Sequence, residues 1–170
     1  MLDYTEDTVY TNLAYLLPAV PAAMLGPLEF GLVGAASVYL TYGSARYHTT
    51  YEREEQGQDA SALLTYLSAL LGALLASWSS WGLLLPVVAA PVHERYVWKI
   101  DTYVAAPAYI GVALVCLGLQ VGLLQAAPSA ALVAVGAAAQ LSTGPRAPLH
   151  SIWHVCGGLS ASLALLMLIL

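Results

Sequence analysis

The chain has 170 residues, of which 59% are hydrophobic and only 9% are charged. That composition leaves too little polar surface to cover a soluble domain of this length, so it excludes the ordinary soluble class and predicts an integral membrane protein. The formal net charge of −5 argues against a nucleic-acid partner, which would bind to a basic surface.

Apolar segments follow one another along the chain with short polar breaks between them. A membrane-spanning helix needs about 20 residues, within a range of about 17–25. On that scale we expect an all-α bundle of seven transmembrane helices, a single domain over residues 1–170, with spans at 9–26, 28–48, 59–77, 79–97, 102–122, 126–142 and 150–169. The division at 77–81 depends on length, because 59–92 is too long for one straight span and barely long enough for two.

The charged residues test this division independently. With seven crossings, the N-terminus and the loops at 49–58, 93–101 and 143–149 share one side of the membrane. Every acidic residue except Glu29 then lies on that side, together with all five basic residues, which are Arg46, Arg53, Arg95, Lys99 and Arg146. Six crossings would scatter these loops over both sides. The positive-inside bias predicts that the charged side is cytoplasmic.

Polar residues suited to chemistry occur near the charged-side ends of three predicted spans. Ser44 and His48 are four residues apart, as are His150 and His154, and residues at this spacing share one face of a helix. Asp59 opens the span at 59–77 on the same side. We therefore expect these five groups to meet at one membrane depth.

This set of residues indicates a zinc site. Three neutral imidazoles bind Zn²⁺ at about 2.0–2.1 Å, and a fourth position left to water is typical of a catalytic site. His150 and His154 would supply a pair from one helix, and His48 would be the third ligand. Zinc lowers the pKa of its bound water to about 7 and polarises a carbonyl. Asp59 could accept the proton of the water, and Ser44 could donate a hydrogen bond to the developing oxyanion.

Each of these residues also has a plainer interpretation. The two histidines at 150 and 154 could be an interfacial pair that faces water or headgroups. Asp59 could cap its helix, and Ser44 could bond the carbonyl four residues back. His93 has no partner four residues away, and we expect it to be a solvated loop residue.

Two stretches of the chain resemble the alkaline ceramidase family. The first, "GSARYHTTYEREEQGQD", carries the family pattern through Gly43, Ser44, Tyr47, His48, Thr50, Glu54, Gln56 and Asp59. The second, "HSIWHVCGGL", carries it through His150, Trp153, His154, Gly158 and Leu159. Ceramidases belong to a wider seven-span superfamily that includes the adiponectin and progestin receptors, and its members share the Ser, Asp and three-His core.

The resemblance implies a zinc-dependent amidase that cleaves the N-acyl bond of a sphingolipid or another N-acyl lipid within the bilayer. It implies His48, His150 and His154 as the zinc ligands, Asp59 as the group that orients or deprotonates water, and Ser44 as a group assisting at the metal. The chain departs from the family at Ala60 and Ser61, where a Glu is usual.

In that family an acidic N-terminal segment binds Ca²⁺. The corresponding carboxylates here are Asp3, Glu6 and Asp7, whereas Tyr4 and Thr8 replace the family's Trp and Asn. Calcium takes about 6–8 oxygen ligands. The family also places its N-terminus away from the cytosol, which is the opposite of the orientation that the charges predict.

Asp101 is the alternative carboxylate. "WKIDTYVA" is similar to a stretch of the receptor branch, and Asp101 too opens a predicted span on the charged side. The eleven-residue spacing after His48 favours Asp59. The alternative function is a receptor or scaffold that keeps a zinc core without turnover. A transporter is disfavoured because residues 104–142 contain no ionisable side chain apart from Tyr109 and Cys116.

Overall fold

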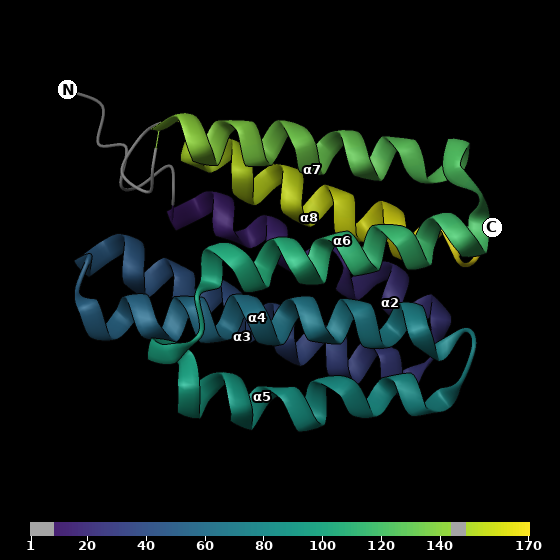
Figure 1. Cartoon of the computed structure of the whole chain (residues 1–170), viewed down its shortest axis with the longest axis horizontal. Coiled ribbons are helices and arrows are strands. Elements are labelled where there is room, and N and C mark those ends of the chain that lie inside the picture. Colours follow the sequence, from purple (N-terminus) through teal and green to yellow (C-terminus); the bar gives the residue numbers. More distant parts are fainter. Residues whose placement is uncertain (1–8, 144–148) are drawn as a thin grey trace.

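The structure is a computed structural model that describes residues 9–143 and 149–170. Over these residues it is all-helical and contains no strand. In chain order the elements are η1 (Asn12–Leu16), α2 (Ala19–Leu25), α3 (Pro27–Thr50), α4 (Arg53–Ala76), η2 (Ser80–Leu83), α5 (Leu84–Tyr96), η3 (Val97–Lys99), α6 (Thr102–Val121), α7 (Leu123–Thr143) and α8 (His150–Met167). The long helices lie side by side with roughly parallel axes (Figure 1).

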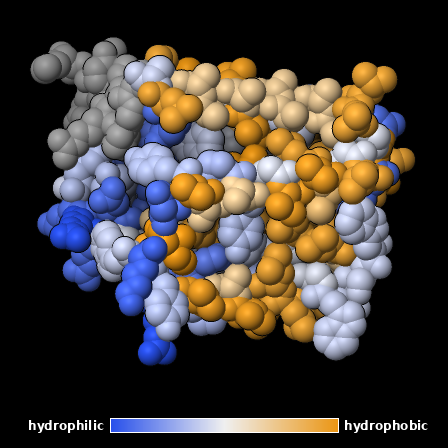
Figure 2. Space-filling view, viewed as in Figure 1, coloured by the Kyte–Doolittle hydropathy of each residue, from blue (hydrophilic) through white to orange (hydrophobic). Residues whose placement is uncertain are grey.

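The outer surface of this bundle is largely apolar. Within the described residues, three helices are long and apolar enough to cross a membrane, namely α4, α6 and α7, and a shorter apolar stretch covers Val9–Leu25. Large hydrophobic side chains point outward, and Leu124 is 91% exposed. Figure 2 shows apolar residues over most of the visible face and hydrophilic residues gathered at one end. An exposed apolar surface of this kind marks contact with a membrane or a partner.

The observed helices differ from the predicted spans at 9–26 and 59–77. The segment at 9–26 is broken into η1 and α2, because Pro18 and Pro21 cannot donate the backbone hydrogen bonds of a continuous helix. Helix α4 begins at Arg53, so the prediction that Asp59 opens this helix was wrong. Glu54 and Glu55 occupy the first turn, where acidic side chains favour a helix start.

The predicted division near residues 77–81 is confirmed at the level of helices. Helix α4 ends at Ala76, and η2 begins at Ser80 before leading into α5. Glycine permits the sharp return, because a Cβ added to Gly72 would meet the backbone oxygen of Gly82 at 2.8 Å. Helix α5 therefore packs directly against α4.

Helix α4 is the centre of the bundle and contacts α3, α5, α6 and α8. Its buried face includes Ala62, Tyr66 and Ala69, which belong to one hydrophobic cluster with Leu40 of α3 and Leu165 of α8. Small residues at 62 and 69 let the neighbouring helices approach closely. This packing holds α3 and α8 against α4, and the predicted histidines lie near the end of α3 and the start of α8.

His93 is not the solvated loop residue that we expected. It lies in α5 and is only 5% exposed, and its Nε2 is 3.1 Å from the hydroxyl oxygen of Tyr109 on α6. The reason is that α5 continues through Pro91 to Tyr96 and packs against α4, which places position 93 within reach of Tyr109 on α6.

Candidate metal centre

Three histidines meet at the end of the bundle where α3 finishes and α8 begins. His48 lies in the last turn of α3, whereas His150 and His154 occupy the first turns of α8. Their exposed fractions are 1%, 4% and 2%. The prediction that these residues converge is therefore confirmed, and an interfacial pair facing water is not what the structure contains.

The spacing of the three imidazoles suits a shared metal ion. Nε2 of His150 is 3.1 Å from Nε2 of His48 and 3.1 Å from Nε2 of His154, and one ligand nitrogen of each residue lies within 4.8 Å of the other two. Two nitrogens that bind one zinc at about 2.05 Å with tetrahedral geometry lie about 3.3 Å apart. The three buried histidines could thus bind a metal ion with little movement.

The Nδ1 atoms of the two α8 histidines, which are not the atoms that face the other imidazoles, contact oxygen atoms. Nδ1 of His150 contacts Oε1 of Gln140 on α7, and Nδ1 of His154 is 3.2 Å from the hydroxyl of Thr11. Metal-binding histidines usually donate their second N–H to such an oxygen, which directs the other nitrogen to the metal. With Nδ1 protonated, His150 has a single lone pair on Nε2. That lone pair faces two neighbouring nitrogens, and a cation shared by all three would satisfy it better than a hydrogen bond to one of them.

Close contact between α8 and the N-terminal segment positions Thr11 and Tyr15. A Cβ added to Gly158 would lie 2.1 Å from the backbone oxygen of Ala14, so only glycine allows this approach. The ring of Tyr15 then packs 5.4 Å from the ring of His154. Gly158 is thus a structural requirement of the site.

Ser44 and Asp59 form a second part of the same site. Ser44 lies on α3 one turn before His48 and is 2% exposed. The Ser44 side chain interacts with the Asp59 carboxylate on α4. Both residues line the same cavity as His48, His150 and His154, which we call the histidine cavity. Asp59 does not cap α4, because it lies within the helix.

Asp101 reaches the histidine cavity but has a different bonding role. It is exposed and precedes the first residue of α6, where its carboxylate accepts a hydrogen bond of 2.9 Å from the backbone N–H of Tyr103. This is a helix cap. Asp3, Glu6 and Asp7, the predicted calcium ligands, lie outside the described residues.

Gln140, Thr11 and Tyr15 were missed in the sequence analysis. The sequence could have indicated Gln140, because it is a carboxamide near the charged-side end of an apolar segment. A polar group at such a position is unfavourable unless it has a partner. Thr11 and Tyr15 had none, since their contacts depend on the packing of η1 on α8.

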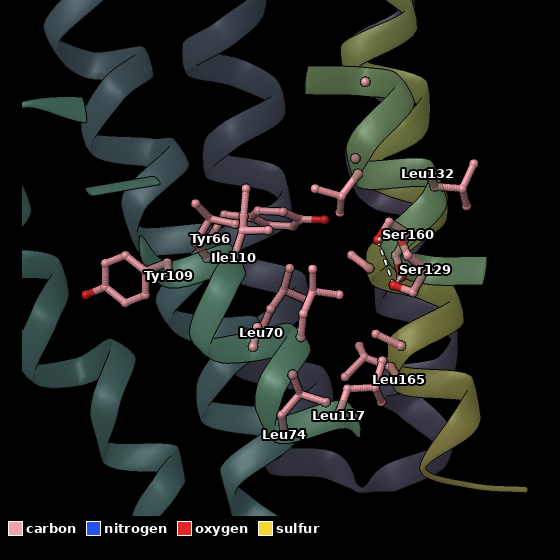
Figure 3. A pocket seen from close by; sticks show the side chains of 18 of the residues that line it. Tyr66, Leu70, Leu74, Tyr109, Ile110, Leu117, Ser129, Leu132, Ser160 and Leu165 are labelled. Carbon is pink, nitrogen blue, oxygen red and sulfur yellow. Dashed lines mark hydrogen bonds between the residues drawn. The ribbon is translucent and has the colours of Figure 1, made fainter. Parts of the chain in front are cut away.

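A second, apolar cavity adjoins the histidine cavity. The two share Tyr15, Leu63 and Trp153 as lining residues. The apolar cavity continues between α4, α6, α7 and α8 past Leu70, Leu74, Leu117 and Leu165, as Figure 3 shows. The site therefore combines a polar end, where the histidines lie, with an apolar extension into the bundle.

Comparison with protein-family models, with curated proteins and with solved structures found no match to this chain.

Proposed function

We propose that the protein is a multi-pass membrane protein in which seven segments cross the bilayer. Three helices of sufficient length and hydropathy support this arrangement, as does the apolar outer surface with charged residues near one end. The remaining segments, Val9–Leu25, α3, α5 and α8, would complete the seven-span bundle that the sequence predicts.

We propose that the histidine cavity binds Zn²⁺ through His48, His150 and His154. Three imidazole nitrogens suit zinc, whereas calcium and magnesium prefer oxygen ligands. The oxygen partners of His150 and His154 support this assignment, because they leave the Nε2 atoms available as ligands. Bound zinc would supply Lewis acidity, which polarises a carbonyl and lowers the pKa of water to about 7.

The proposed reaction is hydrolysis of a lipid amide, as in the alkaline ceramidases that the sequence resembles. Asp59 accepts a proton from water as the water oxygen bonds to the amide carbon. The C–N bond then breaks, and Asp59 returns the proton to the leaving nitrogen. The products are a fatty acid and an amine lipid.

For Ser44 we infer a role that differs from the hydrogen bond to the oxyanion that the sequence predicts. The Ser44 side chain interacts with Asp59, and a serine hydroxyl has only one proton to donate. An oxyanion and the Asp59 carboxylate would therefore compete for that proton. We therefore assign Ser44 to positioning the Asp59 carboxylate.

The observation that carries this proposal is a single cavity lined by three converging histidines and by Ser44 and Asp59, whose side chains interact. The adjoining apolar cavity supports an acyl chain as the part of the substrate that enters the bundle. Ceramide or another N-acyl lipid combines such a chain with an amide.

The test is hydrolysis of ceramide by the purified protein in detergent, with the released fatty acid measured by mass spectrometry. We expect activity that is lost when a chelator removes the metal and that returns when zinc is added. His93→Ala is the matched control, because it removes a buried histidine outside the cluster and should retain activity. Stoichiometric zinc without release of fatty acid from any N-acyl lipid would instead support the receptor or scaffold alternative.

A further inference from the structure

The apolar cavity contains one polar atom without a partner, the hydroxyl of Tyr66. This residue is 2% exposed, and its hydroxyl makes no hydrogen bond to any residue within 9–143 or 149–170. Figure 3 shows the hydroxyl pointing across the cavity from α4 toward α7 and α8. Burying a hydroxyl without a hydrogen bond is unfavourable. A ligand that places a polar group beside this hydroxyl would remove that cost.

Three other hydroxyls at the wall of this cavity are already bonded, and a fourth, that of Tyr15, belongs to a residue that also lines the histidine cavity. Ser129 and Ser160 contact each other at 2.7 Å, and each also donates to the backbone oxygen of the other. Tyr109 directs its hydroxyl away from the cavity (Figure 3), toward His93. Among the described residues that line this cavity, Tyr66 is therefore the one whose side-chain oxygen is fully buried without a hydrogen bond.

The space in front of Tyr66 is unsuited to water alone. The whole apolar cavity has a volume of about 80 Å³, several times the 10–15 Å³ or so that one water molecule needs. A buried water typically makes about three hydrogen bonds, whereas the residues that line this cavity are mostly leucine and other apolar residues. An apolar ligand with a single polar group would match both the leucines and the hydroxyl.

The position of Tyr66 indicates which part of the ligand carries that polar group. The ring of Tyr15 lies 5.4 Å from that of His154 and 5.6 Å from that of Tyr66. Tyr66 is thus separated from the histidines by one further aromatic ring. A group that pairs with Tyr66 would lie along the chain, beyond the amide that reacts at the histidines.

We propose that the apolar cavity selects an acyl chain with an internal hydroxyl group, and that the Tyr66 hydroxyl pairs with it. A hydroxyl both donates and accepts hydrogen bonds, as Tyr66 does. This inference rests on the proposed function for the orientation of the chain, with the carboxyl end at the histidines. The chain belongs to a lipid amide or to a free hydroxy fatty acid.

The test is direct binding, which requires no turnover. Stearic acid and a series of its internal hydroxy isomers would be titrated calorimetrically into the purified protein in detergent. We expect at least one isomer to bind about tenfold more tightly than stearic acid, which is the effect of one neutral hydrogen bond. The absence of any preferred isomer, or of binding by either class of acid, would overturn the inference.

Two variants assign the preference to one hydroxyl. Tyr66→Phe should abolish it and bind stearic acid at least as tightly as the unmodified protein, because no unbonded hydroxyl is then buried. Tyr109→Phe is the matched control and should keep the preference, because its hydroxyl points away from the cavity. A preference that persists in Tyr66→Phe would exclude Tyr66 as the recognition group.

Hydrolysis of the corresponding N-acyl amides separates this inference from the proposed function. A binding preference without release of any acid would refute the hydrolase and leave the subsite intact. Hydrolysis with equal binding of all chains would refute the subsite and leave the hydrolase intact.

Discussion

His93 and the three clustered histidines are buried to a similar extent, but their surroundings differ. His93 is 5% exposed and faces one tyrosine hydroxyl. In the cluster, Nε2 of His150 faces two other imidazole nitrogens, each at 3.1 Å. His150 and His154 also have oxygen partners on their second nitrogens. Burial of a histidine therefore does not by itself indicate a metal site. A better indication is that imidazole nitrogens of several histidines face one another while their second ring nitrogens contact oxygen atoms.

The largest expected effect separates the two kinds of histidine by metal content. We expect about one zinc per chain in the purified protein and little in His150→Ala or His154→Ala, because two imidazoles and water hold zinc weakly. His93→Ala should retain its zinc. Elemental analysis of all four proteins after the same dialysis makes the measurement. Full zinc occupancy in both cluster variants would refute the site.

The next effect distinguishes binding of the metal from the chemistry beside it. Asp59→Asn should keep zinc yet lose about 10²–10⁴-fold in amide hydrolysis, the usual contribution of a general base. An amide can hydrogen-bond water but cannot take its proton. Asp101→Asn should reduce hydrolysis little, because Asp101 caps α6. Initial rates of fatty acid release, compared at equal zinc content, make the test. The reverse ranking would assign the base to Asp101.

A smaller effect tests the oxygen partners of the cluster. Gln140→Leu removes the acceptor of the His150 Nδ1–H and should weaken zinc binding by about 10–100-fold. Gln120→Leu is the control, because Gln120 bonds the backbone oxygen of Leu74 instead. Competition with a chelator of known affinity measures the difference. Equal zinc affinity in both variants would mean that Gln140 does not orient His150.

The smallest effect concerns His93 and its partner. Tyr109→Phe removes one hydrogen bond between α5 and α6 and should lower the free energy of unfolding by about 0.5–1.5 kcal/mol. Zinc content should not change. Thermal unfolding in detergent, followed together with elemental analysis, checks both parts. Loss of zinc in this variant would mean that the His93–Tyr109 contact affects metal binding, so that His93 is not independent of the histidine cluster.

Hydropathy and spacing predicted most of the helices and the three histidines that cluster, because both signals are local. A span is recognised by its length and apolar content, and His150 and His154 share a face because they are four residues apart. The same local signal misplaced Asp59, since polar residues 53–58 looked like a loop although they extend α4. It also misplaced His93, because a polar "HERY" at a segment end predicts solvent irrespective of what packs against it.

The sequence by itself determined the helical class, the apolar outer surface and the candidate ligands, because composition and helical spacing act within one segment. Only the tertiary structure decided which polar groups meet. Thr11 and His154 are 143 positions apart in the chain, and Ser44 reaches Asp59 across two helices. Such contacts depend on how close two helices can pack, which small residues such as Gly158 control. The distance between two packed helices cannot be predicted from hydrophobic periodicity within either one.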